Sequence, residues 1–234
     1  MGGIIPLQTL QYGITFCLFV KKRQIEFYRS NLKILIIYWT DSNLVKVCIL
    51  DYGSGNVRSV YNLVSFLGYD VIVSNERIEI ESATHIILPG VGSFGAAMGK
   101  ITTQIPLKVL KFEVFNNKKL FLGICVGMQV LMEKGYEHGE HDGLGWIPGT
   151  VEKLQVENLP LPHIGWNDII IKQDSDLFTD LGDIKDFYFV HSYAIKTDDS
   201  YILTETNYGS NFYSSIKKDN IYAVQFHPEK SQKA

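Results

Sequence analysis

A single cysteine at a change of pattern constrains this sequence more than any other feature. Residues 120–124 form an apolar run typical of a strand, residues 126–134 have the spacing of a helix, and Cys125 stands between them. Gly123 and Gly127 flank the cysteine, two residues away on each side. Small neighbours permit the sharp turn that exposes a side chain at the end of a strand, as in a nucleophile elbow. We therefore expect an α/β fold in which a strand delivers Cys125 directly to the start of a helix.

The helix that is expected to begin after Cys125 also indicates a chemistry for this side chain. Free N–H groups and the partial positive charge at a helix N-terminus favour the thiolate form of a cysteine. The backbone N–H of Val126 would be available to stabilise an oxyanion. A cysteine in an apolar strand can instead be an inert buried residue. The Gly-x-Cys-x-Gly frame favours the reactive alternative.

The pattern around the cysteine belongs to a longer alternation of strands and helices. Strands are predicted at residues 44–50, 71–73, 85–88 and 120–124, and helices at 56–67, within 96–115 and at 126–134. This alternation is typical of an α/β fold with a largely parallel sheet.

The second half of the chain has a different pattern. After Gly149 strands are predicted in succession at residues 151–154, 168–172, 187–193, 202–206, 212–216 and 221–226. We expect them to extend the same sheet with antiparallel or mixed strands. Residues 44–234 would then form one domain, with residues 1–43 as an N-terminal extension of unknown role.

Composition excludes several classes of function. The net charge of −3 gives no basic surface for nucleic acid. The three cysteines, Cys17, Cys48 and Cys125, are too widely spaced for a zinc site or a disulfide framework, which favours a reducing, cytoplasmic compartment. The apolar run at residues 12–20 is shorter than the roughly 20 residues of a membrane span. We expect no metal, no nucleic acid and no membrane.

A histidine and a glutamate close to the end of the chain complete a candidate catalytic set. His227 and Glu229 are separated only by Pro228, which we expect to keep this segment extended. Residues i and i+2 of an extended chain point the same way, so Glu229 can hold the His227 ring. A surface loop with an ordinary histidine is the alternative. Together with the elbow at Cys125, the pair predicts a Cys-His-Glu triad.

Short motifs along the chain carry a resemblance to a known family. They are residues 51–56 (DYGSGN), 89–94 (PGVGSF), 123–129 (GICVGMQ), 162–167 (PHIGWN), 189–193 (FVHSY) and 225–231 (QFHPEKS). In this order they resemble the class I, triad-type glutamine amidotransferases and, within that group, the glutaminase subunits of imidazole glycerol phosphate synthase. The resemblance implies a flavodoxin-like three-layer fold with a central, mostly parallel sheet and an antiparallel extension.

The resemblance also implies a reaction without a cofactor. Cys125 would attack the side-chain amide of glutamine, His227 would protonate the leaving ammonia, and water would hydrolyse the resulting thioester. The Gly90–Val91 peptide and Val126 would form the oxyanion hole. The glutamine pocket would be lined by Gly92, Gln129, His191, Ser192 and Tyr193. A simple glycine turn at Gly90 and a satisfied core histidine at His191 are the alternatives.

A partner follows from the same resemblance. The ammonia would pass to a cyclase subunit with a (β/α)₈ barrel, forming a heterodimer that makes imidazole glycerol phosphate and an aminoimidazole carboxamide ribotide in histidine biosynthesis. Asn56, Trp166, Tyr188 and Lys230 match positions that face this partner. On the residues alone, Trp166 could equally be a core residue and Lys230 a solvated charge.

Other functions stay open at this point. A related subunit could supply ammonia for amidine groups on surface sugars, a crippled chain could serve as an inactive interaction subunit, and the same fold can house a stand-alone hydrolase or peptidase. Residues 1–43 have no counterpart in the family. The family continues beyond the position of Ala234, so we expect the C-terminal end to be truncated.

Overall fold

The computed structural model describes residues 45–53, 56–178, 181 and 185–231. The expected extension at residues 1–43 lies outside the described residues. Five parallel strands form one side of an eight-stranded sheet, in the order β2-β1-β3-β4-β14. Their bounds are β1 (Lys46–Ile49), β2 (Asp70–Val73), β3 (His85–Gly90), β4 (Leu120–Cys125) and β14 (Ile221–Val224). This is the strand order of flavodoxin-like folds, so the predicted α/β class is confirmed.

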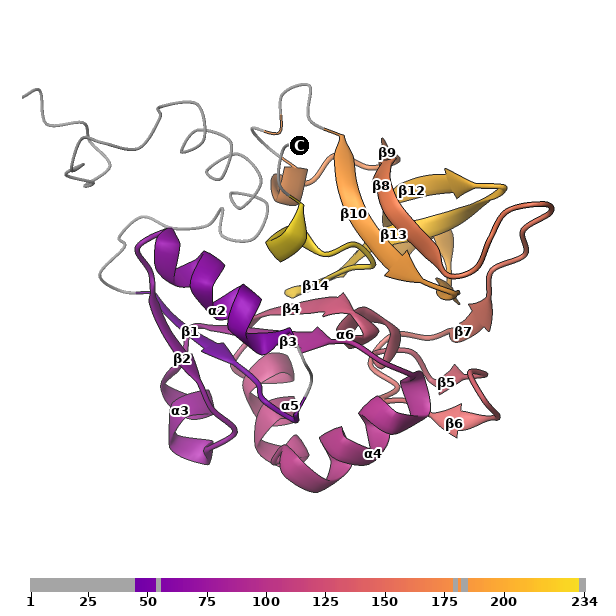
Figure 1. The fold of residues 1–234 in the computed structure, drawn as a ribbon. Helices are drawn as coiled ribbons and strands as arrows, with labels where there is room; N and C mark the ends of the chain where they lie inside the picture. The colour runs from indigo at the N-terminus through magenta and orange to yellow at the C-terminus, as the bar shows by residue number, and fades with distance from the viewer. Residues whose placement is uncertain (1–44, 54–55, 179–180, 182–184, 232–234) are drawn as a thin grey trace, which may run out of the picture.

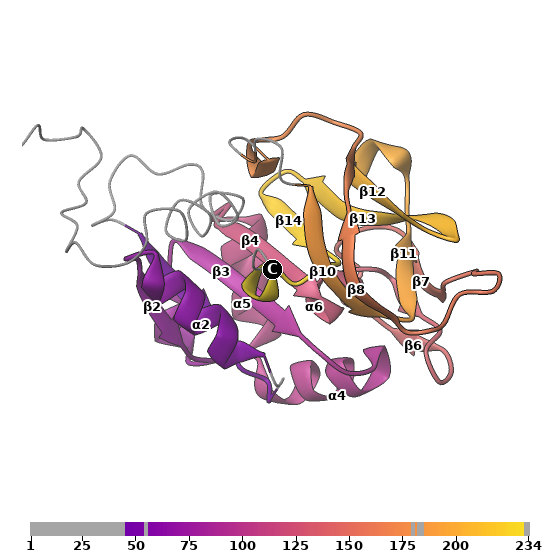
Figure 2. The ribbon, with the colours of Figure 1, turned by 45° about the horizontal axis from the view of Figure 1, so that its top comes forward.

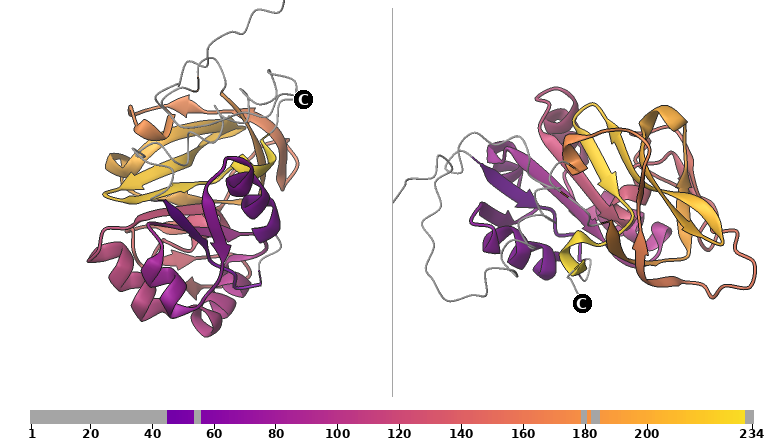
Figure 3. Two further views of the ribbon diagram at one scale, coloured as in Figure 1. Left: turned by 90° about the vertical axis from the view of Figure 1, so that its left-hand side faces the viewer. Right: turned by 90° about the horizontal axis from the view of Figure 1, so that it is seen from above.

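Helices cover both faces of the parallel strands (Figures 1 and 3). On one face lies α2 (Val57–Phe66), which buries Val57, Val60, Leu63 and Val64 as its spacing predicts. The other helices are α3 (Arg77–Ser82), α4 (Phe94–Gln104), α5 (Leu107–Phe115) and α6 (Val126–Gln129). Of these, α3 and α5 pack against each other on the opposite face from α2 (Figure 1).

Two helices differ from the prediction. The helix expected within residues 96–115 is two helices, because Pro106 separates α4 from α5 and cannot donate a backbone hydrogen bond. The helix expected at 126–134 ends at Gln129, after one turn. The chain then runs into β5 (Lys134–Gly135), which pairs with two other short strands. The six-residue helix α3 was not predicted.

The expected antiparallel extension of the sheet is present, but it contains only some of the strands in the second half of the chain. The sheet continues through β13 (Ser210–Lys218), β12 (Ile202–Tyr208) and β9 (Ile170–Ile171), each antiparallel to its neighbour. The remaining strands form two smaller sheets, which corrects the expectation of one continuous sheet. The first of these sheets pairs β8 (His163–Asp168) with β10 (Asp186–His191). The second has four strands in the order β11-β7-β5-β6. Their bounds, besides those of β5, are β6 (His141–Asp142), β7 (Thr150–Lys153) and β11 (Tyr193–Lys196).

Local chemistry explains this division. Ser192 interrupts the run predicted as one strand at 187–193, and its carbonyl accepts from Leu154 N at 2.9 Å, so β10 and β11 enter different sheets. Strand β8 was missed because its apolar side chains, Ile164 and Trp166, are exposed rather than buried. Short 3-10 turns complete the fold, namely η2 (Asp176–Phe178), η3 (Asp199–Tyr201) and η4 (Pro228–Lys230).

The last of these turns brings the two ends of the described chain together. Turn η4 contacts both α2 and β10, and Figure 2 shows it beside α2 near the carboxyl ends of β3 and β4. Ligands of open α/β sheets bind outside these strand ends. Among the described residues, no helix is long and apolar enough to cross a membrane.

Candidate active site

Cys125 occupies a strained turn between β4 and α6. Its backbone has φ 55° and ψ −110°, a conformation that is costly for a residue with a side chain. The flanking glycines make the turn possible by close backbone contacts. A Cβ on Gly123 would lie 2.5 Å from the carbonyl oxygen of Gly127, and a Cβ on Gly127 would lie 1.9 Å from that of Leu88. The elbow expected from the Gly-x-Cys-x-Gly frame is therefore present in the fold.

The residues expected to form an oxyanion hole adjoin the cysteine. Gly90 is the register partner of Cys125 across β3 and β4. A Cβ on Gly90 would lie 2.9 Å from Cβ of Val126 and 2.7 Å from the backbone nitrogen of Gly127, so only glycine fits there. Val126 opens α6, where N–H groups lack partners within the helix. Gly90 thus lies next to both Cys125 and the first residue of α6. Gly92 follows with φ 99°, which favours glycine.

His227 and Glu229 form a buried pair at the other end of the chain. Nδ1 of His227 lies 2.7 Å from Oε1 of Glu229. The segment is not extended as expected. Pro228 begins the single turn η4, in which Lys230 N donates to the carbonyl of His227 at 3.0 Å. Proline fits the first position of a helical turn, where no N–H is needed, and the turn brings the carboxylate back onto the ring.

Further hydrogen bonds fix this pair in place. Asn56 is 3% exposed, and its Nδ2 donates to Oε1 of Glu229 at 3.1 Å. His227 N donates to Tyr188 O at 2.8 Å, which ties the pair to β10. Ser231 Oγ donates to His227 O at 2.7 Å and accepts from Tyr188 N at 3.0 Å. These contacts with Asn56 and Ser231 were not predicted, although both residues lie within the quoted motifs.

The surroundings of His227 favour its protonated form. Burial would lower its pKa, but the charge and hydrogen bonding of Cys125, followed by those of Glu229, raise the pKa to about 10. For Glu229, burial raises the pKa, but the hydrogen bond and charge of His227 and the amide of Asn56 outweigh it and lower the pKa. The result is an imidazolium at His227 that is held by the Glu229 carboxylate. Since Nδ1 is taken by Glu229, Nε2 is the ring nitrogen that remains for the sulfur.

Residues expected to line the glutamine pocket converge on one backbone carbonyl. Gln129 is buried and its Nε2 donates to Tyr193 O at 2.9 Å. Nδ1 of His191 lies 2.9 Å from the same oxygen, and Nε2 of His191 lies 3.3 Å from Nδ1 of His163. Both ring nitrogens of His191 are therefore used within the protein, as in the alternative of a satisfied core histidine. Ser192 lies between β10 and β11, next to this carbonyl.

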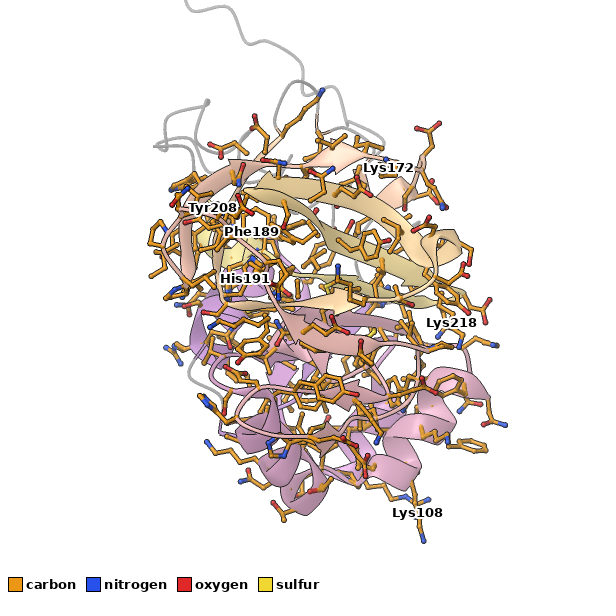
Figure 4. All side chains as sticks on the ribbon, turned by 90° about the vertical axis from the view of Figure 1, so that its right-hand side faces the viewer. Lys108, Lys172, Phe189, His191, Tyr208 and Lys218 are labelled. Carbon is orange, nitrogen blue, oxygen red and sulfur yellow. The ribbon has the colours of Figure 1, made fainter. Side chains whose placement is uncertain are left out.

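Aromatic packing surrounds this histidine pair. The His163 ring stacks on Tyr208 with centroids 4.0 Å apart, and Phe189 lies 5.7 Å from His191. Figure 4 labels Phe189, His191 and Tyr208, which lie close together in the upper part of that view. Burial lowers the pKa of His191 to about 3 and that of His163 to about 4, so both rings are neutral at physiological pH.

One buried residue at the sulfur was not predicted. Gln225 is fully buried directly after β14, and its Nε2 lies 3.6 Å from Sγ of Cys125. Its Oε1 accepts from Nε2 of Gln129 at 3.0 Å. The only signal in the sequence is its place two residues before His227. In the described part of the chain, no group of three His, Cys, Asp or Glu residues is arranged to hold a metal ion.

The remaining predicted positions lie on the outer face of β8 and β10. Trp166 is 39% exposed, so it is not a core residue, and its ring lies 6.2 Å from that of its register partner Tyr188. Nζ of Lys230 lies 6.0 Å from the centroid of the Tyr188 ring. Ile164, on the same strand as Trp166, is 60% exposed. We call Ile164, Trp166, Tyr188 and Lys230 the β8–β10 surface. Asn56 is not part of it, because it is buried against Glu229.

A protein-family model matches this sequence, and solved structures share its fold. Residues 48–234 match the family model Glutamine amidotransferase class-I. The structure of PurLQS from Thermotoga maritima has a TM-score of 0.59 and 17% identity, covering 80% of this chain and 88% of that chain. Another structure, titled as a glutamine amidotransferase, also has a TM-score of 0.59 at 17% identity, covering 78% of this chain and 90% of that chain.

Sequence relatives are much more similar. Imidazole glycerol phosphate synthase subunit HisH 2 of Vibrio vulnificus is 47% identical over 191 residues, which is 81% of this chain and 89% of the relative. The HisH subunit of Aquifex aeolicus is 44% identical over 191 residues, or 81% and 91% of the two chains. That of Methanocaldococcus jannaschii is 46% identical over 187 residues, or 79% and 92%. The chain therefore belongs to the class I glutamine amidotransferases and, within them, to the HisH subunits of imidazole glycerol phosphate synthase.

Proposed function

We propose that this chain hydrolyses glutamine to glutamate and ammonia with Cys125, His227 and Glu229, and passes the ammonia to a cyclase subunit in the cytoplasm. The observation that carries the proposal is the buried pair of His227 and Glu229, 2.7 Å apart, in electrostatic contact with a cysteine on a strained elbow. An imidazolium held by a carboxylate beside a thiolate is the arrangement that cysteine nucleophiles use.

The geometry supports the following sequence of steps. The Cys125 thiolate attacks the side-chain amide carbon of glutamine, and the negative charge moves to the amide oxygen. The N–H of Val126 and that of the Gly90–Val91 peptide would stabilise this oxyanion. His227 then gives its proton to the amide nitrogen, the C–N bond breaks, and ammonia leaves a γ-glutamyl thioester. In the second half, His227 takes a proton from water as the water oxygen attacks the thioester, and the thiolate departs from glutamate.

The glutamine substrate would bind beside the sulfur of Cys125, in a pocket formed by the following residues. Gly92, in its positive-φ conformation, follows β3, which pairs with the strand that ends at Cys125, and Tyr193 begins β11. Gln129 is tied to the Tyr193 carbonyl, so it would shape the pocket from behind.

A partner would dock on the β8–β10 surface. This surface has exposed Ile164 and Trp166 beside the cationic Lys230 and lies next to η4, which carries Glu229. Exposed aromatic and aliphatic side chains of this kind are typical of interface cores. We expect the partner to be a cyclase subunit with a (β/α)₈ barrel, in a heterodimer that makes imidazole glycerol phosphate and the carboxamide ribotide.

A glutaminase assay tests the whole proposal. Glutamate formation is measured for the chain alone, with the cyclase subunit, and with that subunit and its nucleotide substrate. We expect little turnover alone and strong stimulation by the complete mixture. Equal turnover with and without partner would indicate a stand-alone hydrolase instead. In the complex, Cys125→Ala is expected to abolish glutamine-dependent synthesis and to leave synthesis from free ammonia intact.

A further inference from the structure

The hydrogen bonds behind Cys125 form a chain whose direction is set by a backbone carbonyl. The Tyr193 carbonyl oxygen can only accept, so the Gln129 atom 2.9 Å from it has to be the amide nitrogen. The second N–H of this nitrogen points to Oε1 of Gln225, 3.0 Å away. The nitrogen of Gln225 is thereby turned to the other side, where it lies 3.6 Å from Sγ of Cys125.

The opposite orientation of the Gln225 amide is disfavoured. It would place two NH₂ groups against each other and turn a carbonyl oxygen towards the sulfur. Gln129 is 3% exposed and Gln225 is not exposed at all, so solvent has little access to replace the lost hydrogen bonds. Unpaired buried amide groups are costly, which makes the observed direction the stable one.

The Tyr193 carbonyl, at which this chain of hydrogen bonds begins, is itself held in place by a second donor. It lies within 2.9 Å of Nδ1 of His191, which is neutral because burial lowers its pKa to about 3. Facing an acceptor, Nδ1 carries the ring proton. Among the described residues, the titratable groups near the sulfur include His227, at the N-cap of η4, Glu229 on η4, and the neutral His191 of β10 behind Gln129. The side-chain amides of Gln129 and Gln225 lie between these groups and carry no charge.

We propose that Gln225 is a further catalytic residue whose side-chain amide donates an N–H to the Cys125 sulfur, and that Gln129 is the positioning residue that fixes the direction of this donation. The inference rests on the nucleophilic role proposed for Cys125. The hydrogen bond is strongest when the sulfur is charged, which is before attack and again when the thiolate leaves glutamate. Gln225 therefore adds a neutral donor to the charged donor His227.

The test follows alkylation of Cys125 by iodoacetamide in the full chain over a series of pH values. Mass spectrometry of the Cys125 peptide gives the rate, and the Cys48 peptide in the same samples serves as an internal reference. In Gln225→Met, which keeps side-chain length but has no N–H, the midpoint of the pH dependence is expected to rise by about one to two pH units. Gln129→Met leaves Gln225 free to reverse, and a smaller rise is expected.

A matched control separates this effect from a general loss of buried polar contacts. Thr204 is fully buried, with its hydroxyl 2.8 Å from Ser214 Oγ and 2.6 Å from Ser215 Oγ. Thr204→Val is expected to lower the melting temperature without moving the midpoint.

An unchanged midpoint in folded Gln225→Met overturns the inference. If that variant does not fold, an unchanged midpoint in Gln129→Met overturns it. An inactive Cys125→Ala protein together with an unmoved Gln225→Met midpoint removes this inference alone. A Cys125→Ala protein that still hydrolyses glutamine removes the proposed function and this inference with it.

Discussion

His227 and Glu229 are joined through Nδ1 and Oε1 at 2.7 Å, and both side chains are shielded from solvent, at 0% and 1% exposed. The contact is made within one turn of chain, but the residue that supports it, Asn56, comes from 173 positions earlier. The supporting hydrogen bond from Asn56 therefore forms only when the start of α2 and the turn η4 have packed together. Its geometry makes it the most direct place to test the mechanism.

Glu229→Gln should lower glutaminase turnover in the complex by roughly 10²–10⁴-fold, the range typical of general acid–base contributions. The amide keeps the shape of the side chain but cannot stabilise an imidazolium by charge. Turnover and KM are measured for the complex, with Glu152→Gln on the exposed part of β7 as the control for a lost carboxylate. Activity of Glu229→Gln equal to that of the control would contradict the assigned role.

Protonation of His227 should stabilise the folded chain over a defined range of pH. Its pKa of about 10 in the folded protein lies above the ordinary value of 6.5, because Cys125 and Glu229 outweigh burial. The stabilisation is then complete below about pH 6.5 and is lost as the pH rises towards 10. Glu229 does not vary in this window, because the depressed pKa of Glu229 places its titration at lower pH.

Urea unfolding at several pH values measures this effect. The difference in the free energy of unfolding between the wild type and His227→Asn should narrow as the pH rises through this window. His138 is 78% exposed, and His138→Asn serves as the control, for which no such narrowing is expected. A difference that stays constant up to pH 10 would show that His227 is not held as an imidazolium.

Gly127→Ala should destabilise the fold and remove activity. The added Cβ would lie 1.9 Å from the carbonyl oxygen of Leu88, so β3 and α6 would have to separate. We expect a loss of about 1–3 kcal/mol or more in the free energy of unfolding, as for overpacked cores. Gly99 in α4 is the matched control, since a Cβ there meets nothing within 4 Å. Gly99→Ala should stabilise the chain by about 0.5–1 kcal/mol, and denaturant unfolding of both variants decides the question.

The elbow was predictable because its requirements are local. Gly123 and Gly127 lie within two residues of Cys125, so a short stretch of sequence contains the residues that form the turn, although the Leu88 carbonyl that excludes a side chain at Gly127 comes from β3. The parallel half of the sheet was predictable for a similar reason, since each strand and helix has its own periodic pattern.

The missed features depend on distant parts of the chain. Strand β8 breaks the rule that apolar residues are buried, because Ile164 and Trp166 are exposed. The role of Asn56 depends on Glu229, and the contact of Gln225 with Cys125 spans 100 positions. Such contacts leave no periodic signal, so they become visible only when the fold is known.

Substitutions on the β8–β10 surface should weaken binding of the partner without disturbing the isolated chain. Trp166 is 39% exposed and its ring contacts that of Tyr188, so we expect Trp166→Ala to remove little of the core. Central aromatic residues of interfaces commonly cost 2 kcal/mol or more when truncated, so we expect affinity for the cyclase subunit to fall by about 30-fold or more. Isothermal titration calorimetry gives the affinity, and thermal unfolding of the free chain checks its integrity.

The control for this prediction is another exposed aromatic residue far from the proposed interface. Phe112 is 53% exposed on α5, which packs with α3 on the opposite side of the parallel strands from α2. Phe112→Ala should leave the affinity unchanged, because nothing in the proposed complex covers this helix. Equal losses for both variants would argue against the β8–β10 surface. A loss confined to Trp166→Ala, together with reduced stimulation of glutamine hydrolysis, would link docking on this surface to activity at Cys125.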